Sequence, residues 1–188
     1  MKSLKFIALG AMALLVTSLV SSCTMKKSYP EVDFVSLKGT VDSVLAGQTI
    51  YLVDPVTMDA EDSAKVDPTL HFAFADLSRY KEQSSVKLLR ADYVIGTYHL
   101  DLMMPVVVEK GDIHVLFGEN QAMMGSQLND ELNNFLLKLN YFVELAKEQT
   151  PEKARKAFCD YLKEFVSENE NNALGIYVKR AYADKMQS

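Results

Sequence analysis

The chain has 188 residues, a formal net charge of -5 at neutral pH and two cysteines, Cys23 and Cys159. This length suits one domain with a real hydrophobic core. An acidic balance without a long basic run excludes nucleic acid as an expected partner, and an internal disulfide is excluded if one of the two cysteines carries lipid.

The first 23 residues have the features of a bacterial lipoprotein signal. Lys2 and Lys5 precede an apolar run at 6–19, and small residues at 20–22 precede Cys23. This order is typical of a cleaved signal peptide and resembles a lipobox. The alternative is an uncleaved membrane helix, but the run is shorter than the about 20 residues that such a helix needs. We predict that residues 1–22 are removed and that Cys23 carries diacylglycerol and an acyl chain such as palmitate.

Residues 23–33 are predicted to be a lipidated tether, because they are polar and include Pro30. Thr24 stands where an Asp would favour retention in the inner membrane, so the resemblance to lipoproteins implies the outer membrane. Lys26 and Lys27 favour the leaflet that faces the periplasm. Loss of Lys2 and Lys5 with the signal peptide takes the net charge from -5 to -7.

Residues 34–125 have the pattern of a β domain. Alternating or apolar segments between turn residues predict strands at 34–41, 49–53, 63–66, 70–75, 86–91, 98–102, 105–109 and 112–117. The first two are expected to form a hairpin, and the acidic stretch 58–62 a loop. Many short strands at this spacing favour an antiparallel β-sandwich or open barrel.

At Gly125 the hydrophobic period changes from that of a strand to that of a helix. A long amphipathic helix is predicted, with Ser126 as its cap. Thr150 and Pro151 predict the start of a second helix, and a third is expected from Ala173 to about residue 184. The predicted class is therefore α+β, with two to three helices at 126–188 packed on or next to the β domain.

Six short segments match a known family in order and spacing. They are Lys-Gly-Thr-Val at 38–41, Ile-Tyr-Leu at 50–52, Phe-Ala-Phe at 72–74, Glu-x-Gly-Asp-Ile at 109–113, Gly-Ser-x-Leu-Asn-Asp at 125–130 and Asn-Asn-Ala-Leu-Gly at 171–175. Together they resemble a domain of unknown function in lipoproteins of Bacteroidetes. In longer members it precedes a thioredoxin-like domain, in proteins labelled thiol-disulfide oxidoreductases or peroxiredoxin-like. We expect that catalytic half to be absent, since the sequence stops at Ser188 without a redox-active cysteine pair.

Sulfur-containing side chains are the first candidate site residues. Cys159 lies in a helical pattern, which favours a packed hydrophobe over a reactive free thiol. Met103, Met104, Met123 and Met124 are candidate partner-facing residues, with Cu(I) binding as a further alternative, although packing is the favoured interpretation.

The histidines and carboxylates suggest no metal centre. His71, His99 and His114 are expected on the strand faces opposite the apolar residues, and therefore away from the main core. Their spacing matches no ligand motif, so no cofactor is expected, with a histidine cluster that binds zinc or copper as the less favoured alternative. Glu109 and Asp112 are expected to shape or cap their turn rather than to act as an acid and base pair.

Binding is the favoured function, because no nucleophile elbow, P-loop or dinucleotide motif occurs. We predict a non-catalytic, lipid-anchored envelope domain that binds another protein, as an accessory or relic of a thioredoxin-like thiol-disulfide system. The alternatives are a small-molecule-binding lipoprotein and an enzyme that depends on Cys159.

Overall fold

The computed structural model describes residues 28–95 and 98–187, and for 93–100 only the backbone. The strands are β1 (Val35–Val41), β2 (Thr49–Val53), β3 (Ala60–Lys65), β4 (His71–Ala73), β5 (Ser85–Ile95), β6 (Tyr98–Val108), β7 (Gly111–Phe117) and β8 (Ala122–Met124). The helices are α1 (Gln127–Glu148), α2 (Pro151–Glu168) and α3 (Ala173–Ala181), and 3₁₀ turns lie at Ser43–Leu45, Ser78–Tyr80 and Lys185–Gln187.

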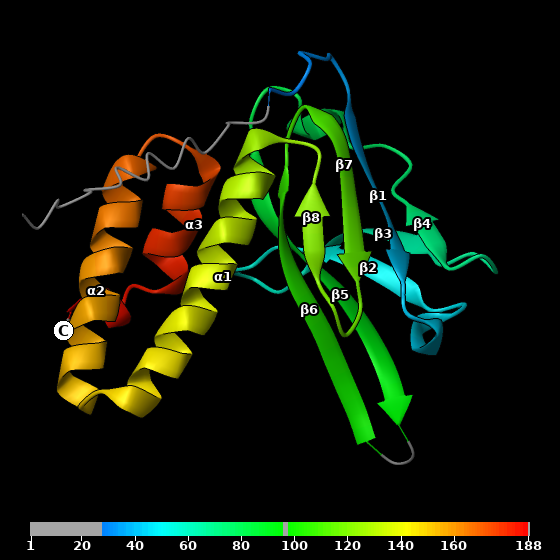
Figure 1. The fold of residues 1–188 in the computed structure, drawn as a ribbon. Coiled ribbons are helices and arrows are strands. Elements are labelled where there is room, and N and C mark those ends of the chain that lie inside the picture. The colour runs from blue at the N-terminus through cyan, green and yellow to red at the C-terminus, as the bar shows by residue number, and fades with distance from the viewer. Residues whose placement is uncertain (1–27, 96–97, 188) are drawn as a thin grey trace, which may run out of the picture.

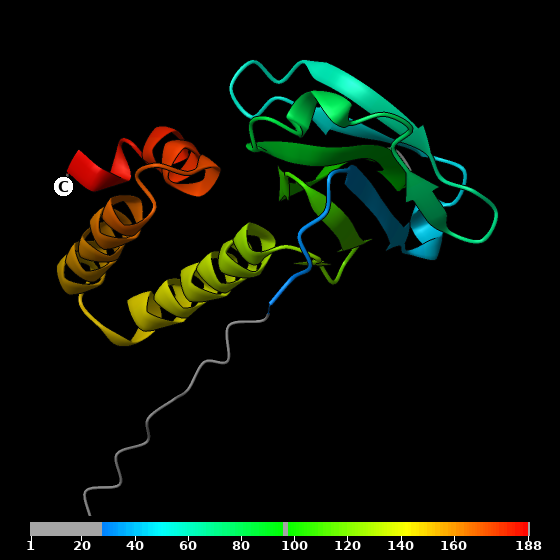
Figure 2. The ribbon, with the colours of Figure 1, turned by 90° about the horizontal axis from the view of Figure 1, so that it is seen from above.

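The strands form two four-stranded sheets. Sheet A has the order β4-β1-β7-β8 and sheet B the order β3-β2-β5-β6. Every pair of neighbouring strands is antiparallel except β1 and β7, which run parallel. The helices follow the last strand in sequence and lie beside the two sheets (Figures 1 and 2). The predicted α+β class is therefore confirmed, and the β part is a sandwich rather than a closed barrel.

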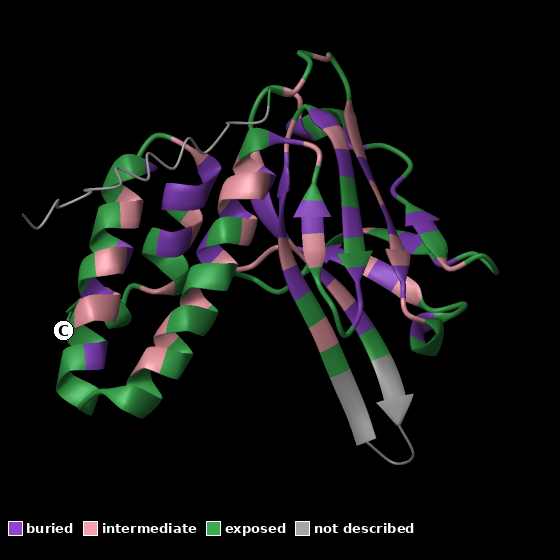
Figure 3. Ribbon diagram, viewed as in Figure 1, coloured by how far each residue is buried: buried purple, intermediate pink, exposed green. Residues whose placement is uncertain are grey.

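Strand alternation places the core between the sheets. Leu37 on β1 and Ile113 on β7 are buried, as are Ile50 and Leu52 on β2 (Figure 3). Gly39 faces the same interior, where an added Cβ would lie 2.5 Å from the Val115 side chain. Only glycine fits at this position, and its lack of a side chain lets β1 lie close to its neighbours.

The predicted hairpin of 34–41 and 49–53 is wrong, because β1 belongs to sheet A and β2 to sheet B. The residues between them include the 3₁₀ turn Ser43–Leu45, whose Leu45 is fully buried. Burial of this side chain takes the chain across the core to the second sheet. The turn at Lys110 and Gly111 is present, but it too connects different sheets, since β6 lies in sheet B and β7 in sheet A.

Three other strand boundaries differ from the predictions. The segments predicted at 98–102 and 105–109 form one strand, β6, which pairs continuously with β5. The loop expected at 58–62 partly belongs to β3, where Ala60–Lys65 pairs with β2. β8 was not predicted, because three residues are too short for alternation to be visible.

Helix α1 covers the side of the sandwich where β6 and β8 are edge strands, and it contacts both. Its Asn129 is fully buried: the side-chain oxygen accepts from Val107 N at 2.9 Å, and the amide nitrogen donates to Val107 O at 2.8 Å. The side chain thus forms hydrogen bonds with both backbone groups of Val107, on the open edge of β6.

The helices have an aromatic core of their own. Phe135 of α1 lies 4.6 Å from Phe165 of α2 and 5.7 Å from Tyr182, measured between ring centroids. The predicted starts of the helices are confirmed: Ser126 accepts from Asn129 N at α1, and Pro151 is the first residue of α2. The aromatic contacts of Phe135 hold the helices together as one unit against the sandwich.

Candidate functional site

The outer face of sheet A contains a groove of about 760 Å³. Its lining comes from all four strands of the sheet, from the last residue of β3 and from the chain after it. It consists of Lys38, Gly39, Thr40, Lys65, Asp67, His71, Phe72, Ala73, His114, Val115, Leu116 and Met124. A volume in this range can accept a small ligand or a segment of a partner.

The strand register explains which side chains meet in the groove. Lys38 on β1 lies opposite Ala73 on β4 and opposite His114 on β7, and His114 in turn lies opposite Met124 on β8. These residues form one row across the sheet. The order of the strands thus brings together positions that are up to 86 residues apart in sequence, from Lys38 to Met124.

The floor of the groove is apolar, although it faces outward. Leu116 is 38% exposed and Met124 is 54% exposed. Both occupy strand positions whose neighbours in sequence, such as Val115 and Met123, fill the core. Leu116 lies on β7 and Met124 on the adjacent edge strand β8, so this face presents apolar side chains from two neighbouring strands.

Ion pairs order the polar side of this face. Lys38 lies 2.9 Å from Asp112 Oδ1, and His114 Nε2 lies 3.0 Å from Asp112 Oδ2. The Lys38 hydrogen bond is the main cause that lowers the pKa of Asp112 to about 2. His71 contacts the Thr69 hydroxyl at 3.0 Å. The groove lining itself contains two lysines and two histidines but one carboxylate, Asp67.

The predicted positions of His71 and His114 are confirmed, since both are exposed on the outer face of sheet A. The side chain of His99 lies outside the described residues. Within the parts of the chain that the structure describes, no group of three or more His, Cys, Asp and Glu residues could hold a metal ion.

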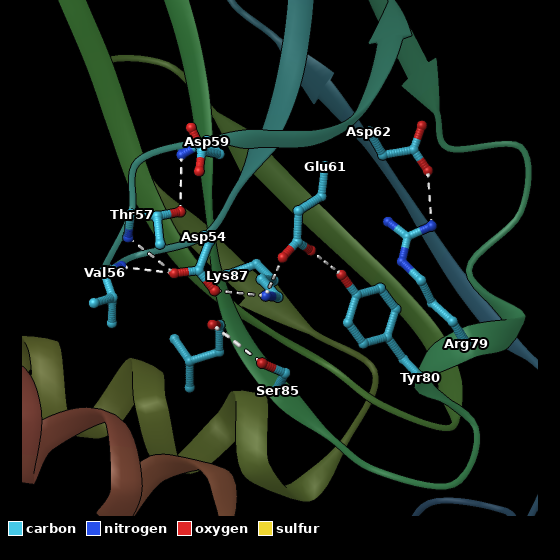
Figure 4. A network of polar contacts seen from close by, with 11 residues as sticks. Asp54, Val56, Thr57, Asp59, Glu61, Asp62, Arg79, Tyr80, Ser85 and Lys87 are labelled. Atoms are coloured by element: carbon cyan, nitrogen blue, oxygen red, sulfur yellow. Dashed lines mark hydrogen bonds and ion pairs between the residues drawn. The ribbon is translucent and has the colours of Figure 1, made fainter.

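A second polar cluster surrounds Lys87 on β5 (Figure 4). The Lys87 side chain is 7% exposed, and its ammonium lies 3.0 Å from Asp54 Oδ2 and 2.7 Å from Glu61 Oε1. The Tyr80 hydroxyl donates to the other oxygen of Glu61 at 2.5 Å. Asp54 also accepts from the backbone N–H groups of Val56 and Thr57.

These contacts keep the Lys87 cluster charged. Burial lowers the pKa of Lys87, but the hydrogen bonds that its ammonium donates to Glu61 and Asp54 outweigh this effect, and the pKa is raised. The same ammonium is the main cause that lowers the pKa of Asp54 to about 2. A lysine in this state is a poor nucleophile or base, so the cluster is best understood as a structural connection between β2, β3, β5 and the Ser78–Tyr80 turn.

The four methionines do not form one partner-facing patch. Met104 and Met123 are buried, as the favoured interpretation of packing predicts, and the partner-facing alternative is wrong for these two. Met103 is 40% exposed on the outer face of sheet B, where it pairs with Arg90, and Met124 is exposed on the outer face of sheet A. Adjacent strand residues point to opposite faces, so each Met-Met pair is split between core and surface.

The remaining candidates fall outside the groove. Cys159 is 1% exposed, and its Sγ lies 3.6 Å from Met186 O, so it packs as expected from its helical pattern. Glu109 follows β6 and lies next to the start of α1, and burial raises its pKa despite hydrogen bonds involving Ser126 and the Leu128 backbone. Cys23 lies outside the described residues. Among those residues, no helix is long and apolar enough to cross a membrane.

Sequence reasoning missed Lys38, Leu116 and the partners of Lys87. A signal was present in two cases. Leu116 is apolar at an outward position of its strand, and Lys87 lies on the same face of its strand as the buried Leu89 and Ala91.

No family model matches the chain, and neither a curated protein nor a solved structure does.

Proposed function

We propose that this chain is a non-catalytic, lipid-anchored domain that binds another envelope protein through the outer face of sheet A. The observation that carries the proposal is the groove on that face, where Leu116 and Met124 are exposed on the neighbouring strands β7 and β8. Lys38, Lys65 and the two histidines lie around them. A fitting partner surface has an apolar centre and carboxylates at its rim.

Lipid attachment at Cys23 would keep the domain at the outer membrane, in the leaflet that faces the periplasm. The signal peptide and lipobox support this part of the proposal. Two or more acyl chains hold a protein at a membrane far more firmly than one does. Partner search is then confined to the membrane surface.

The partner class follows from the family resemblance. Longer proteins of the family that the chain resembles join the corresponding domain to a thioredoxin-like domain, so the proposed partner is a separate protein of a thiol-disulfide system. Cys159 is too buried to supply a reactive thiol itself, which supports an accessory rather than a catalytic role.

The experiment is copurification of the tagged lipoprotein from native outer membranes in gentle detergent, followed by mass spectrometry. The wild type is compared with a Leu116→Asp, Met124→Asp double variant and with Met103→Asp on the opposite outer face. Circular dichroism checks that all three are folded. We expect a reproducible partner with the wild type and with Met103→Asp, and its loss with the double variant.

Equal recovery of the partner by all three proteins would contradict the assignment of the groove. No partner above background with the wild type would contradict the binding role and favour the small-molecule alternative. A recovered protein with a thioredoxin-like domain supports the accessory role, whereas another reproducible partner that is lost with the double variant supports only a general binding domain.

A further inference from the structure

The chain before β1 is held against the domain at two points. The first is Tyr29, which is partly buried and whose hydroxyl donates to Asp130 Oδ2 at 2.8 Å in the first turn of α1. Burial and this carboxylate both raise the pKa of Tyr29, so the phenol stays protonated and remains a donor at neutral pH.

The second point is Asp33, four residues later. Its carboxylate lies 3.0 Å from Lys110 in the β6–β7 turn and 3.5 Å from Lys81. Gly111 N then donates to Phe34 O, which begins the pairing with β7. Residues 29–34 therefore cross one end of the molecule, from the start of α1 to the β6–β7 turn (Figure 1).

The position of Tyr29 limits how far this end can be from the lipid. Cys23 precedes Tyr29 by six residues, and a chain of that length spans at most about 20 Å in any conformation. Without the contacts of Tyr29 and Asp33, the first fixed residue would be Phe34, eleven residues after Cys23. The reach would then increase to about 36 Å, comparable with the domain itself.

We propose that the docked segment 29–33 orients the domain on the membrane, with the start of α1 and the β6–β7 turn facing the lipid surface. The proposal rests on the lipidation of Cys23 proposed above. β5 and β6 extend away from this end for 11 residues each, which is about 36 Å of strand. Their far ends point away from the bilayer, and the groove of sheet A opens sideways, where a partner on the same membrane can reach it.

The experiment measures energy transfer from a fluorophore on the full-length lipidated protein to an acceptor on lipid headgroups of vesicles. One label is placed through Glu82→Cys, at an exposed residue whose charge acts on Lys110. The other is placed through Asp101→Cys, at an exposed residue near the far end of the β5–β6 pair. Cys159 is buried and does not compete for the label in the native protein.

We expect roughly twofold or greater transfer from position 82 than from position 101, because about 23 Å of strand separates Asp101 from the near end of β6 at Val108. Replacing both contacts, in a Tyr29→Phe, Asp33→Ala double variant, should reduce that difference. Tyr141→Phe, at an exposed tyrosine in the distal half of α1, is the matched control and should leave it unchanged.

Equal transfer from the two positions in the wild type would overturn the proposed orientation. So would a double variant that keeps the full difference, since the contacts would then not be its cause. Flotation of the protein with the vesicles separates these outcomes from a failure of lipidation. Cys23→Ala is the negative control and should not float. If the wild type does not float either, the protein has no lipid anchor, and the proposed orientation fails together with the proposed lipidation.

Discussion

At the scale of single residues, the surroundings of Lys87 restrict its substitution. Its ammonium is nearly inaccessible and sits between two carboxylates from β3 and from the end of β2. Removing one partner of a buried ion pair is more harmful than removing the pair, because the remaining charges lose their compensation. The two carboxylates would be left side by side.

Lys87→Met tests this at neutral pH. We expect the free energy of unfolding to fall by about 2 kcal/mol, less than for a fully buried ion pair that loses one member, because Asp54 and Glu61 are 27% and 32% exposed. The measurement is urea denaturation followed by circular dichroism. Lys156→Met is the control, because Lys156 is 77% exposed and pairs with Asp160 along the surface of α2; its loss should cost at most about 0.5 kcal/mol. Equal effects of the two variants would refute the structural role of the Lys87 cluster.

At the scale of elements, one amide joins the helices to the sandwich. Asn129 bonds both backbone groups of Val107, and its amide also donates to Ser126 Oγ at 2.8 Å. Because Val107 is fully buried, water cannot replace these bonds. The side chain is therefore part of the fold of α1 and β6 together.

Asn129→Ala should lower the free energy of unfolding by about 3 kcal/mol, since it leaves a buried N–H and a buried C=O without partners. Thermal and urea unfolding measure the loss. Asn140→Ala, at an exposed position of the same helix, is the control for the change in helix composition. If the two variants unfold at the same urea concentration, Asn129 does not fasten α1 to the sheet.

At the scale of the whole molecule, acid should weaken both sheets at once. Asp112 on sheet A and Asp54 beside sheet B each have a pKa lowered from the ordinary 3.8 to about 2, by Lys38 and Lys87 respectively. A carboxylate with a depressed pKa stabilises the folded state above its unfolded pKa, and this stabilisation is lost as the pH falls toward the folded value. Glu109 has the opposite sign, because its pKa is raised by burial.

We expect the free energy of unfolding to fall steeply between about pH 4 and pH 2, the window set by these two carboxylates. Urea titrations at a series of pH values measure it. An Asp54→Asn, Asp112→Asn double variant should be less stable than the wild type at pH 6 and should lose less on acidification. A double variant with the same pH dependence as the wild type would exclude these two groups as the cause.

The sequence by itself determined the type of most elements and several local features. Alternation placed most strands and exposed His71 and His114, and the change of period at Gly125 separated the strands from the helices. Ser126 and Pro151 marked the helix starts. Each of these signals lies within one turn or one strand, where the backbone geometry alone sets the period.

Only the tertiary structure decided which strands pair and which side chains meet. The turn between β1 and β2 suits a hairpin as well as a crossing between sheets, and burial of Leu45 selects the crossing. Lys87 meets Asp54 across 33 residues, and Lys38 meets Asp112 across 74. Local periodicity has no information about such distances, because strand order depends on how whole faces bury against one another.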